Sequence, residues 1–241
     1  MCLLVVLALT ACSEIQPPEF EDTPSLDINT QVTSESAVED GEYLPITPGN
    51  IGSFSQEQLD TMKKQFQRQL ELAAELNDDV KAWLHLEPLG IDQPVVVPVD
   101  NEQYIRQGLD GGYSESGTLF FDQGFTSFDD KNLIIYGHNM KDGSMFAPIN
   151  NLSAETDSSN CVAILTTSDV MYFYVPASLY TTENLQGYIV NNPDNVSDVQ
   201  AEDSEVNYPW VIADSDHVLT LSTCDFDGSD SNRRVMQFVR W

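Results

Sequence analysis

Apolar residues recur every three or four positions in one stretch near the start of the folded part of the chain. Ser55 and Gln58 just before this stretch have the spacing of a capping box, so we expect Ser55 to be the N-cap of a helix. The stretch predicts one amphipathic helix that runs to about Leu76 and packs on the domain through a single face. The apolar positions are Leu59, Met62, Phe66, Leu70 and Ala73.

Past this helix, the chain changes to short runs of β-branched and aromatic residues, separated by Gly, Pro, Asn and Asp. Each run has the length and composition of a β-strand. About eight strands with few helices predict a mainly β domain, closed or nearly closed into a barrel. The runs are 82–86, 94–99, 117–122, 132–137, 161–167, 170–176, 217–223 and 234–240.

The N-terminus has the features of a targeting segment. Residues 3–9 form an apolar run, which is too short for a membrane-spanning helix of roughly 20 residues. The run ends in the sequence Leu-Thr-Ala-Cys at positions 9–12, which resembles the bacterial lipobox and predicts lipidation of Cys12. The alternative is a truncated signal-anchor helix in which Cys12 has no role. Both alternatives predict export.

Residues 13–52 are rich in Ser, Thr, Pro, Glu and Asp and contain few residues that build a core. Such a composition buries too little apolar area to offset the entropy of the chain, and it predicts a flexible tether. The expected organisation is a signal segment over 1–12, a tether over 13–52 and one folded domain over 53–241 that begins with the helix.

Charge and cysteine content narrow the function classes. With 39 acidic and 10 basic residues the net charge is −29, which excludes nucleic acid as a partner because phosphate binding needs clustered Lys and Arg. The four cysteines show no CxxC spacing and only three histidines accompany them. We therefore expect neither a disulfide framework nor a metal site.

Two strand ends carry candidate chemistry. His138 follows Gly137 at the end of the run 132–137, where an imidazole would stand at the rim of a barrel; the alternative is a histidine in a surface turn. Cys224 directly follows the run 217–223 and precedes an acidic loop, and Arg234 begins the last run. In an antiparallel hairpin the two would be neighbours, and a guanidinium favours the thiolate and can hold an oxyanion. A buried, unreactive cysteine is the alternative.

Two motifs in order resemble those of the sortases, and class B most. The motifs are NLIIYGHNMKDGSMF over residues 132–146 and TLSTC over 220–224, with an Arg ten residues beyond the Cys. Upstream, WLHLEPLGIDQPVV, DNEQYI and YSESGTLFFD also resemble sortase segments, so the similarity covers about residues 80–241.

The resemblance implies an eight-stranded sortase barrel with a packed N-terminal helix and short connecting helices. It implies a cysteine transpeptidase in which Cys224 is the nucleophile, His138 the acid and base, and Arg234, preferred over Arg233, the clamp for the oxyanion and the substrate. These groups need no metal and no organic cofactor. The implied substrate-binding residues are Asn101, Ile105, Tyr136, Ser222 and Thr223.

The implied reaction cleaves a Thr-Gly-type C-terminal sorting signal through a Cys thioester. The acyl group then passes to an amine of a peptidoglycan cross-bridge or a pilin Lys. The partners would be surface proteins that carry the signal, and the enzyme would lie on the extracytoplasmic face of the membrane, held by its N-terminus alone. Two other readings stay open: a cysteine peptidase acting on similar peptides, and a lipoprotein binding module on a sortase barrel.

One segment departs from the class B pattern. The connection from about Thr181 to Asn207 is short, acidic and rich in Asn, where class B enzymes carry a long helix. The sequence leaves open whether a helix is present there. Cys161 opens a predicted strand, where we expect a buried side chain.

Overall fold

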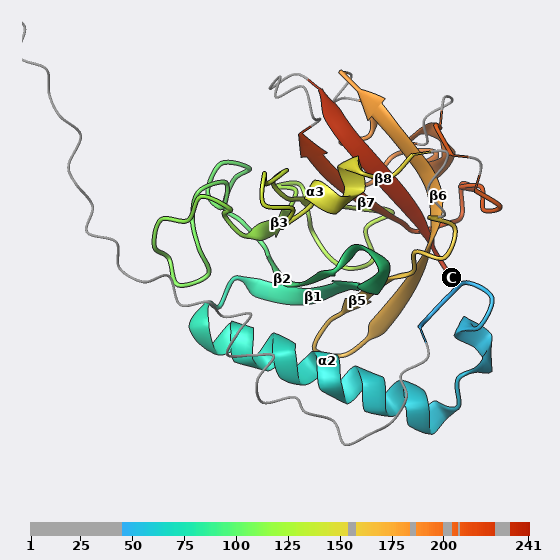
Figure 1. Ribbon diagram of the computed structural model, residues 1–241, viewed down its shortest axis with the longest axis horizontal. Coiled ribbons are helices and arrows are strands. Elements are labelled where there is room, and N and C mark those ends of the chain that lie inside the picture. The colour runs from blue at the N-terminus through green and yellow to red at the C-terminus, as the bar shows by residue number, and fades with distance from the viewer. Residues whose placement is uncertain (1–44, 154–157, 184–186, 200–203, 207, 225–231) are drawn as a thin grey trace, which may run out of the picture.

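The computed structural model describes residues 45–153, 158–183, 187–199, 204–206, 208–224 and 232–241 (Figure 1). The predicted signal segment, with Cys12, and most of the predicted tether lie outside the described residues. Among the residues described, no helix is both long and apolar enough to cross a membrane.

The long helix α2 covers Gln56–Leu76 and begins with the expected cap. The hydroxyl of Ser55 accepts a hydrogen bond from the backbone N–H of Gln58, and the Gln58 side chain accepts one from the Ser55 N–H, at 3.3 and 2.8 Å. This reciprocal pair satisfies two N–H groups that the first helical turn would otherwise leave unpaired. The predicted apolar face is buried at Met62, Phe66, Leu70 and Ala73, whereas Leu59 stays half-exposed.

Eight strands close into a barrel in the order β1-β2-β3-β4-β7-β8-β6-β5, which confirms the predicted fold class. Every predicted run contributes one strand. The strands are β1 (Val80–Leu86), β2 (Ile91–Val96), β3 (Leu119–Phe121), β4 (Asn132–Tyr136), β5 (Ala163–Thr166), β6 (Met171–Thr182), β7 (Val218–Cys224) and β8 (Arg233–Arg240).

Two strand pairs are parallel, β2 with β3 and β4 with β7, and the other pairs are antiparallel. A parallel pair requires a crossover, and the long chain between β4 and β7 supplies it. Strands β4 and β7 therefore run side by side and leave the barrel at the same edge. At this edge β4 ends in Tyr136, within the first sequence motif, and β7 ends in Cys224, the last residue of the second.

The core has two layers. Leucine and phenylalanine side chains from all around the barrel, such as Leu84, Leu133 and Phe238, fill its interior. A second cluster lies between the barrel and α2, where Phe66 of the helix joins Trp83 and Ile164. Figure 1 shows α2 running along the barrel below β1, β2 and β5. Burying one such side chain contributes about 1.5–3 kcal/mol, so packing rather than helix propensity fixes α2 in place.

The folded part begins earlier than the composition predicts. Ile46 and Ile51 are buried in the cluster between the barrel and α2, and a 3₁₀ helix, η1, covers Ile51–Ser53. Buried residues therefore lie ahead of the predicted boundary at residue 53. Composition averaged over forty residues does not detect two isolated apolar side chains that reach a core.

Short helices complete the connections. They are the 3₁₀ helix η2 (Glu87–Leu89), α3 (Ala147–Asn150) and the 3₁₀ helix η4 (Val196–Val199). Of these, η4 lies in the connection between β6 and β7, where Val196 and Val199 pack into the cluster that also contains Val175. In the described part of this connection, no long helix is present, and the helical residues there are 3₁₀.

Candidate active site

The parallel pair β4–β7 brings the two sequence motifs to one edge of the barrel. Tyr136 at the end of β4 is paired with Ser222 of β7, and the N–H of Gly137 donates to the Ser222 carbonyl at 3.2 Å. His138 and Cys224 each follow this matched pair by two residues. Both residues therefore lie at the same level of the same edge, although 86 positions separate them in the sequence.

Gly137 is required by packing at this edge. A Cβ at position 137 would lie 2.5 Å from Leu119 Cδ2 and 2.7 Å from Phe146 Cδ2, closer than real side chains approach. The glycine lets the chain pass against these two buried side chains before it presents His138. Its backbone does not adopt a positive φ, so close approach rather than turn geometry explains the residue.

His138 is half-buried and its ring is held by a backbone carbonyl. The distance from Nε2 to the carbonyl oxygen of Ile105 is 2.7 Å. Since a carbonyl only accepts hydrogen bonds, Nε2 carries the proton and Nδ1 is the basic nitrogen of the neutral ring. The contact also brings together two residues that the sequence predicts for the same site, His138 and Ile105.

Asp122 links two further predicted residues. Its Oδ2 accepts hydrogen bonds from Asn101 Nδ2 at 2.8 Å and from the Tyr136 hydroxyl at 3.1 Å. Asp122 is only 4% exposed, and its Oδ1 accepts from the N–H of Gly124. Burial, followed by the negative charge of Asp122, raises the pKa of Tyr136 far above its usual value. Tyr136 therefore stays protonated and directs its hydrogen toward Asp122.

Ser222 and Thr223 are buried beneath the edge. The Ser222 hydroxyl lies 2.8 Å from the hydroxyl of Tyr188, which comes from the connection between β6 and β7. The Thr223 hydroxyl is buried without a hydrogen-bond partner among the described residues. The two side chains are adjacent in β7 and so lie on opposite faces of the sheet, and both are buried, whereas Asn101, Ile105 and Tyr136 are partly open to solvent.

The hairpin β7–β8 brings two arginines beside the edge. Cys224 is paired with Arg233, and Thr223 is paired with Arg234. Arg234 is 5% exposed, and its guanidinium donates to the Leu152 carbonyl at 2.7 Å and to Thr181 Oγ1 at 3.1 Å. It also forms an ion pair with Glu205. Its Nε–H is buried and has no hydrogen-bond partner in the part of the chain that the structure describes.

The remaining cysteine and histidines lie elsewhere. Cys161 is buried in the barrel interior, as expected. His85 Nδ1 lies 3.0 Å from Asp92, and His217 Nδ1 lies 3.2 Å from the Asp130 carbonyl. Across the described ranges, no group of His, Cys, Asp and Glu is arranged to hold a metal ion. The loop 225–231 and the side chain of Cys224 lie outside what the structure describes.

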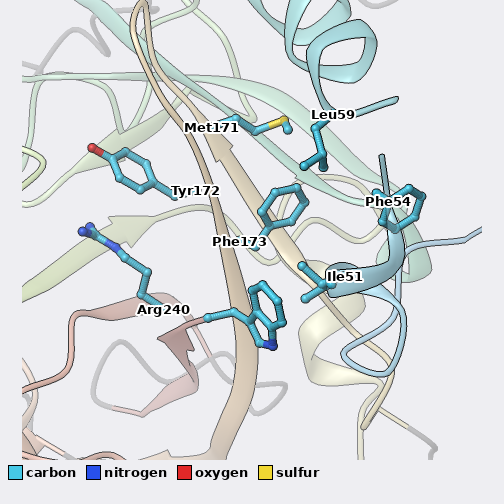
Figure 2. Close-up of a pocket in the computed structure, with 9 residues that line it drawn as sticks. Ile51, Phe54, Leu59, Met171, Tyr172, Phe173 and Arg240 are labelled. Carbon is cyan, nitrogen blue, oxygen red and sulfur yellow. The ribbon is translucent and has the colours of Figure 1, made fainter. Parts of the chain in front are cut away.

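A cavity of about 350 Å³ lies away from this edge. Figure 2 shows Ile51 and Phe54 on one side of it, and Met171, Tyr172 and Phe173 of β6 on the other. None of the residues that line this cavity is a predicted site residue.

The fold defines a class of closed eight-stranded β-barrels packed against one long helix, with the His138 and Cys224 motifs at one edge, and comparison identifies the family. The sortase domain matches residues 84–239. The chain belongs to the sortase family, whose members are cysteine transpeptidases. It is 30% identical to Sortase B of Listeria monocytogenes over 181 residues, which span 67% of this chain and 70% of that protein.

Solved structures of class B sortases have the same fold. The X-ray structure of Clostridium perfringens Sortase B is 26% identical with a TM-score of 0.65, covering 71% of this chain and 98% of that one. The Staphylococcus aureus sortase B-substrate complex is 22% identical with a TM-score of 0.66, covering 77% and 90%. The class B resemblance of the sequence is therefore confirmed.

Sequence reasoning does not single out Asp122 or Tyr188. Asp122 ends the run GTLFFD, in which a carboxylate directly after a buried strand is the available signal. Tyr188 lies in the divergent connection and carries no motif. Each shows its role only through its partner, Tyr136 in one case and Ser222 in the other.

Proposed function

We propose that this protein is a class B-like sortase that cleaves a Thr-Gly-type sorting signal through a thioester on Cys224. The observation that carries the proposal is the matched pair Tyr136–Ser222, since it sets His138 and Cys224 two residues beyond the same level of adjacent parallel strands. Family membership supports the reaction class, and the register supports the choice of residues.

The proposed reaction has two steps. The Cys224 thiolate attacks the Thr carbonyl, the C–N bond breaks, and the protonated His138 gives its Nδ1 proton to the departing amine. An acceptor amine then attacks the thioester, Nδ1 takes the proton of that amine, and the thiolate leaves. Throughout both steps, Nε2–H keeps its hydrogen bond to the Ile105 carbonyl.

A fixed cation beside the thiolate completes the proposed site. The motif position assigns this role to Arg234, whose buried Nε–H is unsatisfied among the described residues. An unsatisfied buried donor costs about 1–3 kcal/mol, so a substrate oxygen that took this hydrogen bond would gain from it. Thr223 is the cross-strand partner of Arg234, and its buried hydroxyl also has no hydrogen-bond partner among the described residues. The register, in contrast, favours Arg233 because it pairs with Cys224.

The proposed substrate groove is lined by Asn101, Ile105 and Tyr136, which are partly exposed, and the buried Ser222 and Thr223 lie beside it in β7. Asn101 and Tyr136 share one acceptor, so their polar groups are fixed before a peptide binds. The proposed partners are surface proteins with a C-terminal sorting signal and an amine of peptidoglycan or of a pilin Lys. The Staphylococcus aureus protein of the same fold was solved as a sortase B-substrate complex, which supports substrate binding by a protein of this fold.

For location, we propose that the domain lies on the extracytoplasmic face of the membrane and is held through its N-terminus by lipidation at Cys12. Mass spectrometry of the mature chain from membranes tests this. An acyl mass on Cys12 supports the proposal, and a mature N-terminus before Cys12, or the absence of that mass, contradicts it.

The experiment for the reaction is a peptide-library screen with mass-spectrometric detection of the acyl-enzyme. We expect a thioester adduct on the wild-type protein and an amide product when oligoglycine is added. Cys224→Ala should form no adduct, and the matched control Cys161→Ala should still form one, because Cys161 is buried in the barrel. Release of free acid alone, even with the amine present, would identify a peptidase. Adduct formation by Cys224→Ala would exclude the mechanism.

A further inference from the structure

The imidazole of His138 makes its contact through a different ring nitrogen from the other two histidines. Its Nε2 lies 2.7 Å from the Ile105 carbonyl, whereas His85 and His217 make their contacts through Nδ1. A carbonyl oxygen accepts and cannot donate, so the contact to Ile105 selects the Nε2–H tautomer of the neutral ring. We infer that the Ile105 carbonyl is a positioning group, which fixes the tautomer and the orientation of His138, and that Gly117 is the residue that leaves room for it.

The segment that carries the Ile105 carbonyl is held in place by the neighbouring residue Tyr104. The ring of the neighbouring Tyr104 is buried, and its hydroxyl donates to Asp79 Oδ2 at 2.7 Å and accepts from Asn77 Nδ2 at 2.9 Å. The Tyr104 carbonyl accepts from the N–H of Thr118 at 3.1 Å. The segment Tyr104–Ile105 is thus hydrogen-bonded to the junction of α2 with β1 through the Tyr104 side chain, and to the start of β3 through the Tyr104 carbonyl.

Gly117 packs directly against the backbone of Tyr104 and Ile105. It has a φ of +60°, and a Cβ there would lie 2.3 Å from the Tyr104 oxygen and 2.5 Å from the Ile105 oxygen. Both neighbours are backbone atoms, so neither can turn away as a side chain would. Any side chain at position 117 therefore displaces the carbonyl that His138 uses.

The consequence for catalysis rests on the proposed function. With Nε2–H bound to Ile105, the lone pair that accepts a proton is on Nδ1. After protonation, Nε2–H keeps its bond, so the ring holds its orientation while Nδ1–H is given to the leaving amine. A ring released from Ile105 would lose this fixed orientation, and small misplacements of catalytic groups are costly in rate.

The first test compares two alanine substitutions at glycines with positive φ. Gly117→Ala collides with the Ile105 carbonyl, whereas Gly111→Ala has the same kind of backbone strain at a φ of +82° but nothing within 4 Å of its Cβ. We expect Gly117→Ala to lower kcat for thioester formation by about 100-fold, the loss that a misplacement near 1 Å produces. Gly111→Ala should stay close to wild type. Equal losses in both variants would overturn the role of Gly117.

The second test needs no activity and no variant that folds poorly. The ¹⁵N spectrum of imidazoles in the wild-type protein, at a pH where the rings are neutral, distinguishes Nε2–H from Nδ1–H. We expect His138 to be the Nε2–H tautomer and His217, whose Nδ1 faces a carbonyl, to be the Nδ1–H tautomer as an internal control. An Nδ1–H tautomer at His138 would overturn the inference. A wild-type protein that has the expected tautomer but forms no acyl-enzyme would instead contradict the proposed function alone.

Discussion

Arg233 is the cross-strand partner of Cys224, and Arg234 is the cross-strand partner of Thr223. Residues that oppose each other in an antiparallel pair lie on one face of the sheet, so the two adjacent arginines project from opposite faces. Arg234 is buried with Thr181, Leu152 and Glu205, whereas Arg233 is half-exposed and its charge lowers the pKa of Tyr136 against the larger effects that raise it. For the role of the cation beside Cys224, the motif position thus favours Arg234 and the strand register favours Arg233.

A matched pair of variants separates these two roles. We expect Arg234→Ala to lower the rate of thioester formation by about 100- to 1000-fold, the loss seen when one oxyanion donor is removed. It should also lower the melting temperature, because Glu205 and the Leu152 carbonyl lose their donor. Arg234→Lys should recover little activity, since a point charge cannot copy the planar fork.

Arg233→Ala is the control, and its melting temperature should match that of the wild type. Rates are measured below the unfolding transition of the less stable variant. A rate loss confined to Arg233→Ala, with Arg234→Ala affecting only stability, would transfer the role of the cation to Arg233, as the register favours.

A second prediction concerns the approach to His138. Gly137→Ala should destabilise the fold by about 1–3 kcal/mol, because its Cβ would overlap Leu119 and Phe146 and the buried chain must shift. Urea unfolding measures this cost. Gly49→Ala is the control, since the nearest atom to its Cβ is 3.9 Å away. A stable Gly137→Ala would show that packing does not explain this glycine.

A third prediction concerns Asp122 as the shared acceptor of Asn101 and Tyr136. In Asp122→Asn, an amide NH₂ at the Oδ2 position cannot accept either hydrogen, so Asn101 and Tyr136 lose their fixed orientation. We expect KM for the sorting peptide to rise about tenfold, equivalent to about 1.4 kcal/mol, with kcat little changed. The effect should be smaller in a Tyr136→Phe background, because part of it acts through that hydroxyl.

Asp129→Asn provides the control at an exposed carboxylate in the loop that follows β3. It should leave KM and kcat unchanged. If Asp122→Asn lowered kcat at constant KM, then Asp122 would act on the chemical step and not on the groove.

Local patterns in the sequence predict most of the fold because the start of the helix and the position of each strand depend mainly on the residues within that element. The capping box at Ser55 fixes the start of α2, and each barrel strand has a run of β-forming residues. The end of β6 is different. Pro176 lacks an N–H and suggests that the strand stops, yet β6 continues to Thr182 through a register shift between Pro176 and Ser178 opposite β8.

The site is less accessible to sequence reasoning because it depends on pairings between distant segments. His138 and Cys224 are found from their motifs, but the parallel register that aligns them is set by the whole barrel. The same applies to the Ile105 carbonyl, since no sequence pattern marks a backbone oxygen as the partner of a ring nitrogen. Asp122 becomes informative only once Asn101 and Tyr136 are seen to share it.

The last prediction concerns Tyr104, which anchors the peptide that holds His138. Burial and, after it, the hydrogen bond to Asp79 raise the pKa of Tyr104 to about 12. The usual pKa of tyrosine, about 10, applies in the unfolded chain. Between these two values the unfolded chain loses the proton first, so the stability due to this residue is complete below pH 10 and is lost as the pH rises to about 12.

We therefore expect Tyr104→Phe to be less stable than wild type by about 1–3 kcal/mol at pH 8, because Asp79 and Asn77 lose their buried partner. The difference between the two proteins should narrow as the pH rises from about 10 to 12. Tyr174, whose pKa burial also raises to about 12, contributes equally to both proteins and cancels. Urea unfolding at a series of pH values measures the difference, with Tyr113→Phe at a 77% exposed position as the control. A gap between wild type and Tyr104→Phe that stayed constant up to pH 12 would show that the Tyr104 hydroxyl titrates as it does in the unfolded chain.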